Sequence, residues 1–281
     1  MNEAAFSVEV QGDWLAGPWR TPCNNARHEA GTIHDDATAQ AHGYRSGTVA
    51  GSIHMEQFAP LLLHALGPGW LERGALSLWF RAPSVDSEPV RALVQAQGAQ
   101  RRVRMLTAQG LEVLEGSASA TLDSHGAVRQ HLAQSLPGAA PRMLAQVPVG
   151  WAVHGLPTRV AQAAIERRRH LLTEAVGDGV PLSAAVHAMR VYEPLLPLQL
   201  GAAVGLFGAI EWQWLAGPMK AEHNYLVDAR VLDVGDSPRS EMLWCETTLR
   251  DAAQGHAVAR MLMLSRLLKA SSPLWTETPA S

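Results

Sequence analysis

The pattern of hydrophobic and polar positions divides the chain into two halves with a similar layout. Residues 51–66 are apolar around most of a helix circumference, which predicts a long helix enclosed by other structure. Gly67-Pro68-Gly69 ends this helix, and Pro60 requires it either to begin later or to kink. Period-two alternation with short separations then predicts an antiparallel meander over residues 75–83, 90–97, 101–109 and 111–122. A further edge strand is predicted over residues 6–10.

The second half repeats this order. The run PLLPLQLGAAVGLFGAIEWQWLAGP, residues 194–218, predicts a second long apolar helix that ends at Gly-Pro. Strand patterns follow at residues 225–234, 240–251 and 256–268. A helix is also predicted over residues 158–176, whereas residues 123–157 are rich in Pro, Gly, Ala and Ser and predict a linker.

A helix that is apolar on most sides needs a sheet to enclose it. We therefore predict an α+β fold, a double hot-dog in which each unit is an antiparallel sheet wrapped around a long buried helix. The N-terminal unit would span residues 1–125, a linker residues 126–157, and a degenerate C-terminal unit residues 158–281. Such a chain forms an internal pseudo-dimer or a homodimer. A single large α+β domain is the alternative.

Composition narrows the functional class. Apolar residues make up 47% of the chain and charged residues 17%, which is typical of a folded protein with a large core. The net charge of −3 gives no reason to expect a nucleic-acid or membrane partner. Cys23 and Cys245 lie far apart, and no run of about 18 apolar residues occurs. These features predict a cytoplasmic protein with a small-molecule partner.

The candidate chemistry lies just before the first apolar helix, in HEAGTIHDDATAQAHGYRSGTVAG, residues 28–51. Glu29 and His34 are suited to act as an acid–base pair. Gly51 opens the helix, so its N–H could stabilise an oxyanion on a polarised thioester carbonyl. A solvated loop is the alternative for this stretch, and capping of a short helix is the alternative for Asp35 and Asp36.

This stretch resembles the site of the MaoC-like, or (R)-specific enoyl-CoA hydratase-like, hot-dog proteins. Their motif D-x-N-P-x-H is matched by Glu29 and His34 at its two ends, with Gly31 and Thr32 in place of Asn-Pro. Gly43-Tyr44 is similar to the family's Gly-Phe pair. Gly51 falls at the glycine of its His-Gly element, with Ala50 in place of the histidine.

The resemblance implies a hydratase or dehydratase that acts on a β-hydroxyacyl or α,β-unsaturated acyl thioester, carried by CoA or a carrier protein, with no metal or redox cofactor. Glu29, His34 and Gly51 would be catalytic, and this requires that they face one cavity. The residues expected to contact substrate are Asp35, Asp36, Tyr44 and Ser52.

Three alternatives remain open from the sequence. The first is hydrolysis of an acyl thioester. The second is a non-catalytic acyl-ligand-binding or assembly subunit, which the altered motif favours. The third is a tailoring enzyme whose large pocket is walled by Trp212, Trp214 and Trp244. The basic runs at residues 101–104 and 166–170 are interpreted as solvated faces, or else as contacts for CoA phosphates.

Overall fold

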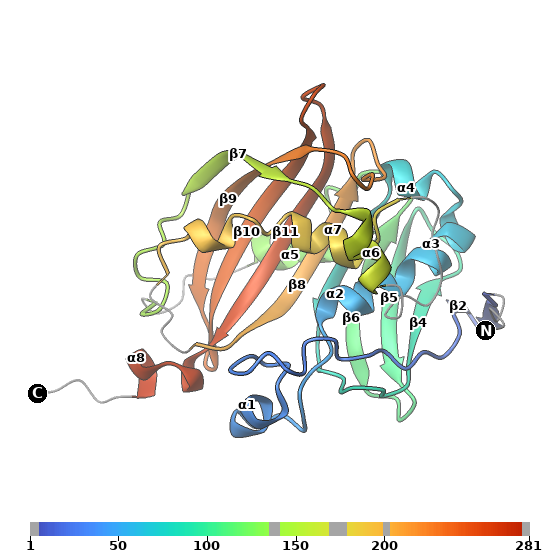
Figure 1. Cartoon of the computed structure of the whole chain (residues 1–281). Helices are drawn as coiled ribbons and strands as arrows, with labels where there is room; N and C mark the ends of the chain where they lie inside the picture. Colours follow the sequence, from blue (N-terminus) through green and yellow to red (C-terminus); the bar gives the residue numbers. More distant parts are fainter. Residues whose placement is uncertain (1–5, 135–140, 169–178, 199–202, 277–281) are drawn as a thin grey trace, which may run out of the picture.

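A computed structural model describes residues 6–134, 141–168, 179–198 and 203–276. Its strands form one antiparallel sheet in the order β1-β2-β4-β5-β6-β3-β8-β11-β10-β9-β7 (Figure 1). The first six strands in this order come from the N-terminal half and the other five from the C-terminal half. The sheets of two similar units are thus joined edge to edge through β3 and β8, which is the expected internal pseudo-dimer.

The N-terminal meander lies where the alternating pattern predicts it. The strand predicted at residues 6–10 instead begins at Glu9 and forms a hairpin at the sheet edge with the strand that starts at Trp14. The strands of this half are β1 (Glu9–Gln11), β2 (Trp14–Ala16), β3 (Ala75–Phe80), β4 (Val90–Gln95), β5 (Gln100–Thr107) and β6 (Glu112–Ser119).

The predicted first apolar helix is present as two consecutive helices. α2 (Gly51–Glu56) and α3 (Phe58–Leu66) are separated at Gln57. Pro60 lies in the first turn of α3, where its missing N–H breaks no intrahelical hydrogen bond. Phe58, Leu61 and Leu62 are fully buried against the sheet. The sequence argument for a kink or a later start is therefore confirmed.

The prediction of a second long helix over residues 194–218 is wrong. Its described part contains a short 3-10 turn, η2 (Glu193–Leu195), and a strand, β8 (Gly205–Trp214). β8 lies in the middle of the sheet, and its residues from Gly208 to Trp214 are all buried. A strand buried on both faces loses the polar alternation that identifies strands, and its apolar run then looks like a buried helix.

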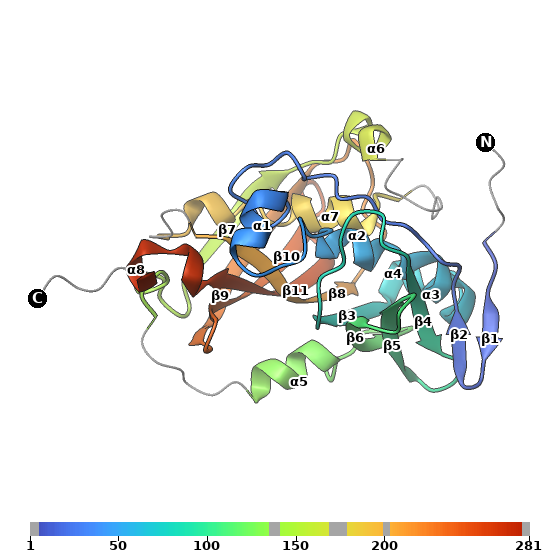
Figure 2. The ribbon, with the colours of Figure 1, turned by 90° about the horizontal axis from the view of Figure 1, so that it is seen from below.

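The other strands of this half agree with the prediction: β9 (Tyr225–Asp236), β10 (Ser240–Asp251) and β11 (Ala257–Leu268). The enclosed helix of this half is α7 (Leu182–Ala188), in which the first five residues are buried. Figure 2 shows α2, α3 and α7 on one face of the sheet and α5 (Ala127–Ala133) on the opposite face. The remaining short helices are α1 (Asp36–Ala41), α4 (Trp70–Arg73), α6 (Gln162–Arg168), η3 (Lys269–Ser271) and α8 (Pro273–Thr276).

The expectation that residues 126–157 lack regular structure is also wrong. This segment contains α5 and the start of β7 (Ala152–Thr158), which pairs with β9 at the sheet edge. α5 is held by polar contacts that a composition rich in small residues does not indicate. Val128 donates its backbone N–H to Ser77 Oγ at 2.8 Å, and Arg129 pairs with buried Glu211 at 2.6 Å. Of the helix predicted over residues 158–176, residues 162–168 form α6, whereas Thr158 ends β7 and residues 169–176 lie outside the described part of the chain. No helix in the described ranges has the length and apolar character to cross a membrane.

A buried carboxylate links the enclosed helices of the two halves. Glu56 at the end of α2 accepts a hydrogen bond from the backbone N–H of Ser183 in α7 at 2.8 Å. Burial raises the pKa of Glu56 to about 7, although the Ser183 hydrogen bond and Arg168 partly oppose this. The folded protein therefore holds a proton on Glu56 at pH values where the unfolded chain has lost it.

This linkage predicts a loss of stability with rising pH. Between the unfolded pKa near 4.5 and the folded pKa near 7, the native state binds more protons, so the free energy of unfolding falls as pH rises. A Glu56→Gln variant, which keeps an acceptor for Ser183, should remove this part of the slope. Urea denaturation at pH 5 and pH 8 measures the free energy of unfolding of both proteins. The difference between variant and wild type should favour the variant more at pH 8 than at pH 5. An equal difference at both pH values would contradict the prediction.

Candidate active site

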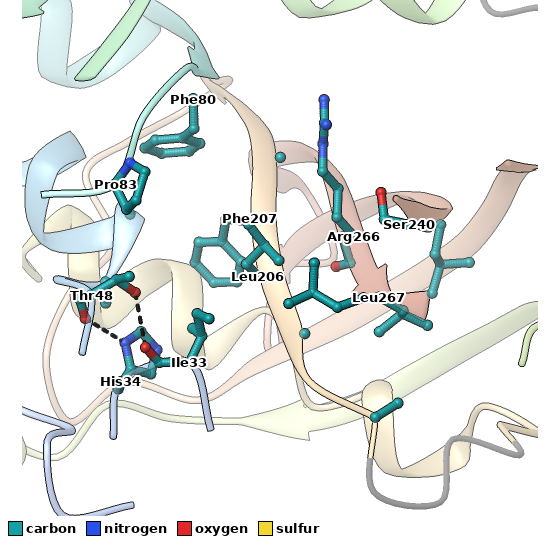
Figure 3. Close-up of a pocket in the computed structure, with 18 of the residues that line it drawn as sticks. Ile33, His34, Thr48, Phe80, Pro83, Leu206, Phe207, Ser240, Arg266 and Leu267 are labelled. Carbon is teal, nitrogen blue, oxygen red and sulfur yellow. Dashed lines mark hydrogen bonds between the residues drawn. The ribbon is translucent and has the colours of Figure 1, made fainter. Parts of the chain in front are cut away.

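A cavity of about 680 Å³ lies where the sheets of the two halves separate. β3 and β8 pair from Ala75 with Gln213 as far as Trp79 with Ala209. Beyond this last pair, Phe80 and the residues Gly205–Gly208 line the cavity on its two sides (Figure 3). The volume is in the range of pockets that enclose a small organic ligand.

His34 reaches this cavity from the loop before α1. Its ring Nδ1 lies 2.7 Å from the backbone oxygen of Thr48. Because a carbonyl oxygen can only accept, Nδ1 carries the proton, and Nε2 of the neutral ring keeps its lone pair. Asn24 holds the same loop by donating from Nδ2 to the His34 backbone oxygen at 2.8 Å. The imidazole is thus oriented as a proton acceptor.

Gly51 lines the cavity at the first position of α2. The first N–H groups of a helix have no intrahelical acceptor, so its amide is free to serve a ligand. A Cβ at this position would lie 2.7 Å from Cζ of Phe80 and 3.2 Å from Cδ2 of Phe207. Glycine therefore keeps the space between two aromatic rings open.

Glu29, the expected acid–base partner, is not brought to the cavity with His34. The Glu29 side chain is exposed and is not among the cavity-lining residues. The backbone of Glu29 takes part in two successive turns. Its N–H donates to the Ala26 backbone oxygen at 2.9 Å. Its own backbone oxygen accepts from the N–H of Thr32 at 3.2 Å and from Thr32 Oγ1 at 2.7 Å. Gly31, with φ of +78°, completes the reversal. These turns lie where the family motif has Asn-Pro, and they direct the Glu29 carboxylate to solvent.

Asp35 and Asp36, which were expected to contact substrate, are also not among the residues that line the cavity. Asp35 is the N-cap of α1 and accepts from Thr38 N at 2.9 Å and Thr38 Oγ1 at 2.6 Å, which lowers its pKa. Asp36 accepts from the hydroxyl of Ser46 and from Gly47 N at 2.8 Å. Both carboxylates use their acceptors to fix the loop that carries His34.

Tyr44 and Ser52, the other two residues expected to contact substrate, differ in whether they line the cavity. Tyr44 lines the cavity, and burial raises the pKa of its hydroxyl. Ser52 is fully buried in α2, is not among the lining residues, and its Oγ has no partner within the described part of the chain. Its expected contact with substrate is therefore not supported by its position.

His187 is a cavity residue that the sequence reasoning missed. It lies in the last turn of α7 and lines the cavity, and part of its side chain is exposed to solvent. Desolvation lowers its pKa to about 4, and the charges of Arg168, Arg190 and His34 act in the same direction. His187 is therefore neutral near pH 7. The signal that could have located it is the apolar run LSAAV directly before it, which marks the enclosed helix.

The helix side of the cavity also contains a neutralised ion pair and a buried histidine. Arg190 makes two hydrogen bonds to Glu193, of 2.7 and 2.8 Å, and its guanidinium lies 4.6 Å from the centre of the Phe207 ring. His54 of α2 is buried, and its Nε2 lies 2.7 Å from Ser84 Oγ. Desolvation lowers the pKa of His54 to about 4, so it too is neutral near pH 7.

The tryptophans of the second half do not form a pocket wall. Trp212, Trp214 and Trp244 are almost completely buried, and none lines the cavity. Trp212 and Trp214 instead pack edge to face with ring centres 5.0 Å apart in the core. The first basic run lies on β5, where Arg102 and Arg104 approach the Trp14 ring. The second lies partly outside the described residues.

Comparison with solved structures shows the same fold in other proteins. A MaoC domain protein from Chloroflexus aurantiacus, named as a dehydratase, is 11% identical with a TM-score of 0.59, covering 94% of each chain. A conserved protein of Mycobacterium tuberculosis, described as a double hotdog fold, is 11% identical with a TM-score of 0.60, covering 92% of this chain and 96% of that one.

The dehydratase domain of PpsC from Mycobacterium tuberculosis, solved in complex with C12:1-CoA, is 10% identical with a TM-score of 0.50, covering 94% of this chain and 97% of that one. No family model and no curated protein matches the sequence. The expected double hot-dog fold is confirmed, and the chain is similar to MaoC-like dehydratases in its fold.

Proposed function

We propose that the protein is a hydratase or dehydratase of a β-hydroxyacyl or α,β-unsaturated acyl thioester. The observation that carries the proposal is that the Nε2 lone pair of His34, the neutral ring of His187 and the first residue of α2, Gly51, meet at one cavity between the two hot-dog units. Each half of the chain supplies one histidine. His187 takes the place in the reaction that the sequence argument gave to Glu29.

In the dehydration direction, the thioester carbonyl accepts a hydrogen bond from the Gly51 N–H, which stabilises the enolate that forms when the α-carbon loses its proton. His34 Nε2 takes that proton. The bond between the β-carbon and its hydroxyl oxygen then breaks, the electron pair of the enolate forms the double bond, and His34 returns the proton so that water leaves.

His187 would hold the β-hydroxyl, or the attacking water in the hydration direction, by a hydrogen bond. A ring with a pKa of about 4 is almost entirely neutral near pH 7, so it acts as a positioning group and not as the main proton donor. The proposed reaction thus uses one base and one orienting ring. The chemistry needs only groups of this chain and the substrate.

The structural neighbours support the reaction class. Two of them are named as dehydratases, and one was solved with an acyl-CoA ligand. A cavity of about 680 Å³ with mostly apolar walls is suited to an acyl chain.

The test is an assay of purified protein with crotonyl-CoA and with 3-hydroxybutyryl-CoA, followed by absorbance of the enoyl thioester. We expect interconversion of the two without release of free thiol. Release of CoA without an enoyl intermediate would instead identify a hydrolase. A third outcome is that both thioesters bind, which raises the melting temperature, but neither they nor their longer-chain homologues are turned over. That outcome would identify a non-catalytic acyl-binding protein.

A further inference from the structure

The cavity has a second end with a different chemistry from the histidine end. Arg81, Arg239 and Arg266 line it. The guanidinium of Arg266 lies 5.4 Å from the centre of the Trp79 ring, and Trp79 in turn contacts His131 of α5, with ring centres 4.1 Å apart. Because α5 covers the face of the sheet opposite α7 (Figure 2), the Trp79 ring beside Arg266 lies on the far side of the sheet from His187.

One cavity reaches both faces because the sheet is open at this point. β8 continues for four residues, Gly205–Gly208, beyond its last pair with β3. Figure 3 shows His34 and Thr48 on one side of the β8 strand and Arg266 on the other, where β11 pairs with β8 and Arg266 lies opposite Leu206. A ligand held at His34 can therefore extend between the two units towards the arginines.

The arginine end of the cavity has more guanidinium groups than carboxylates that pair with them. Arg81 is neutralised by Glu115, to which its Nε donates at 2.8 Å. Glu193 carries the one carboxylate among the described lining residues, and it is bound to Arg190. Arg239 and Arg266 therefore have no carboxylate partner in the described part of the chain.

Arg266 is the more constrained of the two. Its Nε is buried and makes no hydrogen bond to the described residues. Burial lowers the pKa of Arg266, as expected for a cation that lacks a counter-charge. Both guanidinium groups lie close enough to Tyr44 to oppose the rise in its hydroxyl pKa. Two cations and one phenol therefore surround the same space.

We propose that Arg239 and Arg266, with the Tyr44 hydroxyl, bind an oxyanion of the ligand whose acyl group lies at His34. This rests on the proposed function, because the acyl thioester is what places the anion. The planar guanidinium fork matches a phosphate or a carboxylate, and the Trp79 ring packs beside the guanidinium of Arg266. The anion is either a phosphate on the carrier side of the thioester or a carboxylate at the far end of the acyl chain.

Three saturated probes, which cannot be turned over, separate these sources. Butyryl-N-acetylcysteamine is neutral, butyryl-pantetheine 4′-phosphate adds a phosphate on the carrier side, and the mono-N-acetylcysteamine thioester of glutaric acid adds a carboxylate on the acyl side. Calorimetry should show that one of the two anionic probes binds about 10- to 100-fold more tightly than the neutral probe, which is typical for a charge-assisted hydrogen bond. The probe that gains affinity identifies the source.

Arg266→Gln and Arg239→Gln should each reduce this gain, and the double variant should abolish it. Arg260→Gln is the matched control: it lies on the same strand and, by alternation, on the same face, its Nε is also buried without a partner, but it does not line the cavity. The gain should survive in this control and should shrink with added salt.

Two results would overturn the proposal. If the neutral probe binds but neither anionic probe gains affinity, or if the gain persists in the double variant, the anion site is wrong while the proposed function stands. If none of the three probes binds, both are wrong.

Discussion

Replacing His34 by asparagine should reduce turnover of an acyl thioester about 1,000-fold, in the range typical for loss of a general base. The asparagine amide can still donate to the Thr48 backbone oxygen, as Nδ1 of His34 does at 2.7 Å, but it offers nothing at the position of Nε2. The loop should therefore keep its conformation while the proton acceptor is lost. Turnover and the melting temperature, measured together, check both parts of the expectation.

Glu29→Gln provides the control. Glu29 was the partner expected from the motif, but its side chain is exposed and outside the cavity, so its replacement should change turnover by less than about twofold. A loss in Glu29→Gln as large as that in His34→Asn would restore the motif-based pair. Near-wild-type turnover in His34→Asn would contradict the mechanism itself.

The parts of the fold that the sequence predicts well are those in which local pattern and tertiary environment agree. β9 from Tyr225 to Val231 and β10 from Cys245 to Asp251 alternate between buried and more exposed positions, so their positions follow from that alternation. β8 does not, because α5 and the enclosed helices cover it on both faces. The same burial that makes β8 central to the sheet removes the pattern that identifies it as a strand.

The site shows the same limit at the level of single residues. His34 and Gly51 could be identified from the sequence because both belong to one stretch just before an apolar helix. Their partner His187 is more than 130 positions further along the chain, and it becomes a neighbour only when β3 pairs with β8. Glu29 shows the opposite case: it is close in sequence, but two turns separate it from His34. Spacing along a chain therefore constrains a site only where the intervening backbone conformation is also known.

Gly47→Ala should impair both folding and catalysis, because Gly47 packs directly on the loop that presents His34. A Cβ at this position would lie 2.0 Å from the His34 backbone oxygen and 2.8 Å from its carbonyl carbon. Backbone atoms cannot rotate out of the way as a side chain could, so the loop must shift. We expect a loss of about 2–3 kcal/mol in the free energy of unfolding. The resulting displacement of the His34 ring should reduce turnover by about 100-fold.

Gly31→Ala in the same loop is the control that separates general strain from this specific contact. Gly31 has φ of +78°, so an alanine there should cost about 1–2 kcal/mol, but a Cβ would meet no atom within 4 Å. Urea denaturation gives the stability of each variant, and turnover is compared at a temperature where both are folded. Gly31→Ala should keep turnover close to the wild type and Gly47→Ala should not. If the two variants lose stability and turnover equally, close packing of Gly47 on the His34 carbonyl does not position the base.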